Sequence, residues 1–382
     1  MRQPPDPHAA VERVAELTPD AADLLCLCAF LDPAHPIPVP AIRAGVDTLP
    51  QRMVEALFDP AACERVFDAL LDAGAGGVAG GELVLRPAAA AAARERLDAD
   101  ARRAWAGRAA RMMEAGFPDD PAREGHREAA ERFLPHVIAA ARSALDEGTE
   151  PGAAAQLLYL AGRYVLEARS DFPAARGLLE RATAARALAH GADDVRVALD
   201  LNYLNGALLH LGEWAAMAAN AVRAAEILEG EYGPRDRTVI THVNNAALLL
   251  ARAGERGPAR AWFTRALTLA GPVFGAAHPF CATILNNLGD LDRGEGDLQA
   301  ARVAYGRALA IDEAAYGPRH NSVARDLAKL GEVLVDTGDP AAARPLLQRA
   351  LAWVSETEGP DDVRAVHLRA LLARVADLPP AS

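Results

Sequence analysis

Lysine is almost absent from the 382 residues: Lys329 is the only one, and it follows an alanine inside an expected helix. A Walker phosphate loop requires Gly-Lys-Ser/Thr, because the lysine reaches the phosphates and the hydroxyl reaches Mg²⁺. The glycine-rich run 74–81 has no lysine nearby. Gly74, Gly76 and Ala79 match the dinucleotide-binding spacing, but that motif follows a strand and opens a helix, whereas this run follows a helix and precedes a strand. We therefore interpret the run as a hairpin turn and expect no ATP binding there.

Aromatic residues are also scarce, at 5%, although 51% of the chain is hydrophobic and much of that is alanine. This composition favours closely packed helices and argues against a sheet-rich core. There is no run of about 18 apolar residues, so no membrane span is expected. Residues 1–8 are polar and proline-rich and lack the apolar core of a signal peptide. We expect a cytoplasmic protein.

The four cysteines and ten histidines do not form a recognisable site. Cys26 and Cys28 are two residues apart on a helical stretch and so point to different sides; buried free thiols are the better interpretation. There is no His-Glu-x-x-His and no paired Cys-x-x-Cys sequence. No Ser/His/Asp or Cys/His arrangement is tied together by sequence either. The sequence predicts no catalytic residue, no metal, no cofactor and no enzymatic activity.

Net charge argues against nucleic-acid and anionic-membrane partners. The chain has 52 acidic and 40 basic residues, a formal charge of −12. Binding to phosphate backbones or anionic lipid requires clustered positive charge.

The most informative stretch is 232–358, because it repeats itself every 42 residues, the signature of a repeat array. Two glycine ladders and an arginine ladder keep this step. Their members are Gly233, Gly275, Gly317 and Gly359; Gly212, Gly254, Gly296 and Gly338; and Arg223, Arg265, Arg307 and Arg349. Counting backward by the same step reaches Gly191 and Arg181.

Each repeat has the pattern of two helices joined by a turn. In 280–293 the apolar residues recur at spacings of three and four, and His278-Pro279 is a good helix start. A second helix is predicted over 298–315, after Gly296. His278 and His320 lie one period apart and are assigned to the turn between repeats. Neither helix can bury its apolar face alone, whereas stacked neighbours can.

These residues resemble the tetratricopeptide repeat. Small residues stand where its two helices approach closely, at Gly289, Gly296, Ala301 and Ala308. The usual unit has about 34 residues, and this longer one looks like the kinesin-light-chain variety, with Leu-Asn-Asn-Leu-Gly at 285–289. HEAT-type arrays have similar periods but lack this pattern. The resemblance implies an all-α fold, an α-solenoid of five such repeats followed by a capping helix.

The N-terminal segment carries a second resemblance. A buried helix near Leu24, a short strand at 83–86 after the glycine run and a further helix over 87–97 suggest a winged helix. In detail the segment resembles the winged helix that follows the nucleotide-binding domain of bacterial STAND-class (NB-ARC) signalling ATPases. Phe133-Leu134-Pro135-His136 is similar to the linker of that family, and the nucleotide-binding domain is missing from this chain. Within 17–98 acidic residues outnumber arginine, which counts against DNA binding.

The predicted organisation has five parts. They are a disordered N-terminus (1–16), a winged-helix-like domain (17–98), linker helices (99–150), five tetratricopeptide repeats (151–359), and a capping helix with a tail (360–382).

The candidate binding residues come from an asparagine ladder on the first helices of the repeats. Asn202, Asn244 and Asn286 lie 42 residues apart, and the ladder stops at Ala328. In kinesin-light-chain-like arrays the matching asparagines hydrogen-bond an extended peptide, and a side-chain amide offers both a donor and an acceptor. The alternative is that the ladder only joins neighbouring repeats, a role for which Asn245 and Asn287 are the better candidates. Further side chains expected in the same concave groove are Thr241, Thr283, Asp290, Arg252, Arg293, Arg325 and Glu332.

We therefore predict a non-enzymatic protein that binds a protein or peptide ligand in the concave groove. As implied by the second resemblance, it would be the sensor or regulatory part of a STAND-type signalling system, with a nucleotide-binding module as a partner in cis or trans. A stand-alone tetratricopeptide adaptor or scaffold is the alternative. A winged-helix transcriptional regulator is a third class, disfavoured by the acidic balance.

Overall fold

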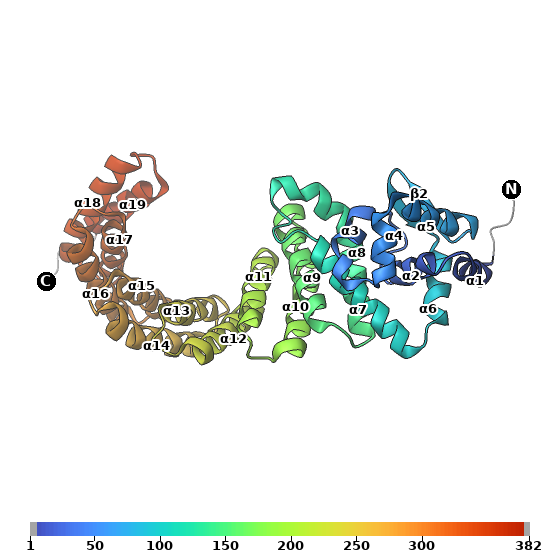
Figure 1. Ribbon diagram of the computed structural model, residues 1–382. Helices are drawn as coiled ribbons and strands as arrows, with labels where there is room; N and C mark the ends of the chain where they lie inside the picture. The colour runs from blue at the N-terminus through green and yellow to red at the C-terminus, as the bar shows by residue number, and fades with distance from the viewer. Residues whose placement is uncertain (1–5, 378–382) are drawn as a thin grey trace. The chain divides into compact units, whose positions relative to one another are not determined.

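The computed structural model describes residues 6–377 and divides into two compact units, Met1–Gly212 and Glu213–Ser382. Both are built almost entirely from helices (Figure 1). The boundary at Gly212 falls inside the second of the five predicted repeats. The domain boundaries proposed from the sequence otherwise remain predictions.

The first half of unit 1 combines short helices with a small sheet. The strands β1 (Ile37–Pro38), β2 (Gly76–Ala79) and β3 (Glu82–Leu85) are antiparallel in the order β1-β3-β2. Gly80 and Gly81 form the tip between β2 and β3 with positive φ, which confirms the predicted hairpin turn. The surrounding helices are α1 (Pro7–Leu17), α2 (Pro19–Cys28), α3 (Val39–Ala44), the 3₁₀ helix η1 (Val46–Thr48), α4 (Gln51–Phe58), α5 (Pro60–Asp72) and α6 (Pro87–Arg96).

Helix α1 corrects the expectation of a disordered N-terminus for the described residues from 7 onward. Asp6 caps the helix and Pro7 occupies its first position, where a missing N–H costs nothing. Ala10 and Val14 are buried on one face, and α1 packs against α6 and α2. Ala10 and Val14 stand four residues apart in the sequence, the spacing of one helix face, and burial of this stripe stabilises the eleven-residue helix.

Longer helices complete unit 1, and one of them, α8 (Arg127–Asp146), contacts the sheet through His136. His136 is fully buried, and its Nε2 donates to the carbonyl oxygen of Pro36, just before β1 (2.9 Å). Burial lowers the pKa of His136, so the imidazole packs in the neutral form. The elements are α7 (Ala99–Gly116), η2 (Glu124–His126), α8 (Arg127–Asp146), α9 (Pro151–Tyr164), the π-helix η3 (Val165–Arg169), α10 (Phe172–His190) and α11 (Val195–Leu211).

Unit 2 is a stack of antiparallel helix pairs (Figure 1). Each helix packs against the next, and first helices of successive pairs also meet, α13 with α15 and α17 with α19. The helices are α12 (Trp214–Tyr232), α13 (Arg237–Arg252), α14 (Arg256–Phe274), α15 (Pro279–Gly294), α16 (Leu298–Tyr316), α17 (Asn321–Asp336), α18 (Pro340–Thr357) and α19 (Val363–Asp377). The capping helix has its own core contacts, since Ala365, Leu368, Leu371 and Val375 are buried in a cluster with α17 and α18.

The 42-residue ladders are turn positions. Every glycine of both ladders has a positive φ, from 71° at Gly212 to 101° at Gly275, a conformation that other residues adopt only with strain. Three residues after each of Gly191, Gly233, Gly275 and Gly317 stands a side chain that caps the following helix. Asp194, Asp236, His278 and His320 each accept a hydrogen bond from a backbone N–H at the start of the following helix. The predicted assignment of the two histidines to the inter-repeat turn is thereby confirmed.

Gly289 marks the closest approach of α15 and α16, as the small-residue pattern indicated. A Cβ at this position would lie 2.5 Å from Cε1 of Tyr305, a side chain that is 1% exposed. One repeat later, a Cβ on Gly331 would lie 2.6 Å from Leu347. The same close contact therefore recurs at the same position of two repeats.

Gly289→Ala is expected to lower the free energy of unfolding by about 1–3 kcal/mol, because the buried ring cannot move without overpacking its neighbours. Gly294→Ala is the matched control, since nothing lies within 4 Å of its added Cβ; there alanine should be neutral or slightly stabilising. Urea unfolding of both variants measures the difference. Equal stability of the two would show that the Gly289 contact is not tight.

Candidate functional site

The structure places the three ladder asparagines in different environments. Asn202 is exposed on α11, in unit 1. Asn244 on α13 and Asn286 on α15 are buried, with 5% and 3% of their surface exposed. Side chains so enclosed have little area to offer a ligand.

Asn244 and Asn286 make contacts between repeats. Nδ2 of Asn286 donates to Oδ1 of Asp326 on α17 (2.8 Å). Oδ1 of Asn244 accepts from Nδ2 of Asn287 on α15 (3.2 Å). For these two residues the geometry favours the alternative in which the ladder joins neighbouring repeats. Asn245, predicted to join neighbouring repeats, is instead exposed.

The remaining predicted groove residues of α13 and α15 are mostly exposed. Thr241 and Thr283 donate their hydroxyls to backbone carbonyls one turn earlier (2.9 and 3.3 Å). The guanidinium of Arg252 lies 5.3 Å from the ring centroid of Trp214. The predicted list therefore mixes exposed side chains with buried ones.

Ion pairs connect α15 to α17. Lys329 Nζ lies 2.6 Å from Oδ2 of Asp290, and Arg293 donates to both carboxylate oxygens of Glu332 (2.7 and 2.9 Å). Asp290 also accepts from the hydroxyl of Tyr305 (2.7 Å). These contacts bring together Asp290, Arg293 and Glu332, which the sequence placed in one groove.

A cleft of about 490 Å³ lies between α17 and α19, with α18 beneath it. Its apolar part is formed by Ala324, Ala328, Val354, Val363 and Leu368. Its polar part consists of Asn321, Ser322, Arg325, Lys329, Glu332, Arg364 and His367. Three permanent cations and one carboxylate line it, and each cation also pairs with a carboxylate outside the cleft: Arg325 with Asp312 and Asp326, Lys329 with Asp290, and Arg364 with Glu358 and Asp362.

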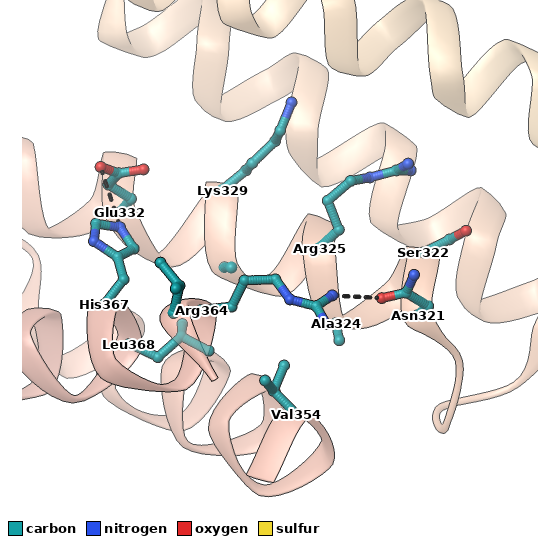
Figure 2. Close-up of a pocket in the computed structure, with 12 residues that line it drawn as sticks. Asn321, Ser322, Ala324, Arg325, Lys329, Glu332, Val354, Arg364, His367 and Leu368 are labelled. Atoms are coloured by element: carbon teal, nitrogen blue, oxygen red, sulfur yellow. Dashed lines mark hydrogen bonds and ion pairs between the residues drawn. The ribbon is translucent and has the colours of Figure 1, made fainter. Parts of the chain in front are cut away.

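Two contacts cross the cleft, as Figure 2 shows. Nη1 of Arg364 on α19 donates to Oδ1 of Asn321 at the start of α17 (3.1 Å), and His367 Nε2 lies 3.8 Å from Glu332. Arg325 and Lys329 extend from α17 away from α19 in the same view. The cleft thus has an apolar floor, polar ends and a basic margin, which suits an apolar side chain flanked by negative charge.

Sequence reasoning found two residues of this cleft, Arg325 and Glu332, but not the cleft itself. The signal was present at Ala328, where the asparagine ladder stops: a small residue there opens space between α17 and α19. The other half comes from α19, which the sequence predicted only as a capping helix.

Family comparison agrees with the pattern of ladders. The sequence model described as "Tetratricopeptide repeat" matches residues 239–314 and again 280–352. The array is a solenoid of tetratricopeptide repeats. Those matches cover α13 to α18 almost completely, and so include one wall of the cleft.

Several solved structures are similar to parts of this chain. BtubC (BKLC) from P. vanneervenii is 21% identical over 61% of this chain and 91% of its own (TM-score 0.46). A putative kinesin light chain with nearly identical TPR-like repeats from Podospora anserina is 16% identical over 55% and 98% (TM-score 0.46). A Rap protein complexed with competence and sporulation factor is 16% identical over 75% and 80% (TM-score 0.40). No curated protein sequence matches the chain.

Two other kinds of site are absent from the described residues. Within 6–377, no three His, Cys, Asp or Glu side chains are grouped so that they could hold a metal ion. No helix of that range combines the length and apolarity needed to cross a bilayer. Of the four cysteines, all free, Cys28, Cys63 and Cys281 are buried and Cys26 is half-buried. Burial, with a contribution from Asp23, raises the pKa of Cys26 to about 11, so this thiol is not activated.

Proposed function

We propose that the protein binds a peptide segment of another protein on the inner face of its tetratricopeptide array, and that the α17–α19 cleft anchors it. The observation that carries this proposal is the cleft's combination of an apolar floor with a lining that holds three permanent cations and one carboxylate. The segment that fits has an aliphatic side chain for the floor and an acidic group for the margin. Exposed Thr283 and Asp290 on α15 extend the polar surface beyond the cleft.

Filling the cleft tests the proposal. A random-peptide phage library selected on the full chain should yield binders, and Ala328→Arg should weaken them by about tenfold or more, or 1.4 kcal/mol. Val303→Arg is the control, because Val303 is 61% exposed on α16 and does not line the cleft. Binders that are equally sensitive to both substitutions, or to neither, would place recognition elsewhere.

The finer proposal is that the chain is the sensor part of a STAND-type signalling system, with the N-terminal segment as its winged-helix-like domain. Support comes from the element order α2-β1-α3-α4-α5-β2-β3 with a three-stranded antiparallel sheet. Leu71, Val78 and Val84 are exposed beside the hairpin (63%, 46% and 39%), and an apolar surface of this kind suits a docked module. The adaptor alternative predicts no such partner.

Leu71→Asp separates the sensor from the adaptor. If a nucleotide-binding module docks on this surface, pull-down with the full chain should recover an ATP-binding protein, and the variant should lose it. Recovery of the same proteins by both chains, or of no ATP-binding protein by either, would favour the adaptor.

A further inference from the structure

One pair of positions recurs where the second helix of one repeat meets the first helix of the next repeat, and its residues differ from repeat to repeat. The first position lies near the end of the second helix, and the other lies 14 residues later in the first helix of the following repeat. The pairs, each one period of 42 residues after the last, are Arg186/Asp200, Leu228/His242, Ala270/Ile284 and Asp312/Asp326.

The first of these pairs is a buried ion pair. Nε of Arg186 lies 2.7 Å from Oδ2 of Asp200, and the side chains are 6% and 0% exposed. Opposite charges meet there, although burial still raises the pKa of Asp200 and its Oδ1 has no hydrogen-bond partner. Three periods later Asp312 occupies the arginine position, so that two carboxyl groups meet where a cation and an anion would be balanced.

Asp312 on α16 and Asp326 on α17 are as buried as the ion pair, with 1% and 0% of their surface exposed. Arg325 contacts both: Nη2 lies 3.4 Å from Oδ2 of Asp312, and Nε lies 3.1 Å from Oδ1 of Asp326. The other oxygens, Oδ1 of Asp312 and Oδ2 of Asp326, are buried without a hydrogen-bond partner. A buried acceptor without a donor is costly, and one proton held between the two carboxyl groups would supply that donor.

We propose that Asp312 and Asp326 form a proton-binding site that holds one shared proton in mildly acidic solution and loses it near neutral pH. Burial and the charge of Asp326 raise the pKa of Asp312 to about 6, from an ordinary value of 3.8. Two carboxyl groups that share one site behave in this way because both cannot ionise freely.

The groups around the pair only partly balance its negative charge. From α15 the pair meets the neutral amide of Asn286, which donates to Asp326. From α17 it meets Arg325, a single positive charge for two carboxyl groups. The nearby charges Glu313 and Lys329 are paired with Arg349 on α18 and Asp290 on α15.

The pH dependence follows from linkage. Between about pH 4 and pH 6 the folded chain binds more protons at this site than the unfolded chain, so its contribution to stability is fully present below that window and is lost as the pH rises through it. Arg325 also lines the cleft. If the cleft binds acidic peptides, as proposed above, protonation of the pair weakens its hold on Arg325 and favours ligand binding at lower pH.

Asp312→Asn tests the site without any ligand, because asparagine has the shape of the protonated acid and no titration. We expect the full-length variant and the wild type to have similar unfolding constants near pH 4, at the lower end of the window. At pH 8 the wild-type constant should be larger than that of the variant by up to about 100-fold, as follows from a pKa of about 6 in the folded chain against an ordinary value of 3.8. Urea unfolding between pH 4 and 8, followed by circular dichroism, measures the ratio. Asp312→Ala, which copies the residue at position 270, should show the same loss of pH dependence.

The matched control is Asp200→Asn at the equivalent position of the ion pair. That change leaves buried Arg186 without its counter-charge and should raise the unfolding constant at pH 8, the opposite sign. A wild-type to Asp312→Asn ratio that stays constant from pH 4 to 8 would overturn the proposal, as would failure of both position-312 variants to fold. Since no peptide is used, such a result would leave the proposed binding function untouched.

Discussion

Asp200→Ala is expected to lower the free energy of unfolding by about 3–5 kcal/mol, because it breaks a buried ion pair on one side only. Arg186 would keep its charge at 5% exposure. Its hydrogen bond to Oε1 of Gln156 at 3.4 Å would remain, as would the ring of Tyr159, 5.7 Å from its guanidinium carbon, and a longer-range attraction to Glu114. None of these replaces a carboxylate in direct contact. Urea unfolding of the full chain at neutral pH measures the loss.

A double variant separates the cost of an orphaned charge from the cost of altered packing. Arg186→Leu combined with Asp200→Ile uses residues that the chain itself places at these positions, Leu228 and Ile284. Replacing both charges by apolar groups is often neutral or stabilising. We expect the double variant to be markedly more stable than Asp200→Ala; equal destabilisation would mean that shape, and not charge, determines this contact.

Tyr305→Ala is expected to cost about 3–5 kcal/mol, the range for removing a buried aromatic ring. Tyr305 is 1% exposed, packs on Gly289 and joins Val333 of the next repeat in one core cluster. Its loss would therefore loosen both its own helix pair and the neighbouring one. Thermal or urea unfolding followed by circular dichroism measures the change.

Tyr305→Phe is the control for the ring alone, since it keeps the packing and removes only the hydroxyl bond to Asp290. That bond is worth about 0.5–1.5 kcal/mol, and Lys329 still pairs with Asp290 in the variant. If the phenylalanine variant were as unstable as the alanine variant, the hydrogen bond would outweigh the packing, contrary to our account.

The sequence was most informative where a backbone requirement fixes the residue. Glycine at a left-handed turn and a capping side chain three residues later recur because each repeat needs the same turn. Gly289 could be assigned to a close helix contact for the same reason, and the structure confirms it with the Tyr305 ring. These features are local, so one sequence suffices to find them.

The candidate site could be predicted only in part, because it depends on how far each side chain lies from the next repeat. Asn202, Asn244 and Asn286 share a position in the repeat, yet the first is exposed and the other two are buried. What differs is the partner, such as Asp326 for Asn286, which no periodicity specifies. Predicting the cleft would have required the position of α19, and predicting α1 would have required its contacts with α6. Both depend on tertiary structure, which the repeat pattern does not specify.

Hydrogen exchange with a bound peptide tests the central claim most directly. The full chain would be compared with and without a saturating peptide chosen from the phage selection. Our account predicts slower exchange in α17 and α19, around 321–336 and 363–377, with little change in 17–98, and no protection in Ala328→Arg at the same peptide concentration. Protection of 17–98 with α17 and α19 unchanged would contradict it.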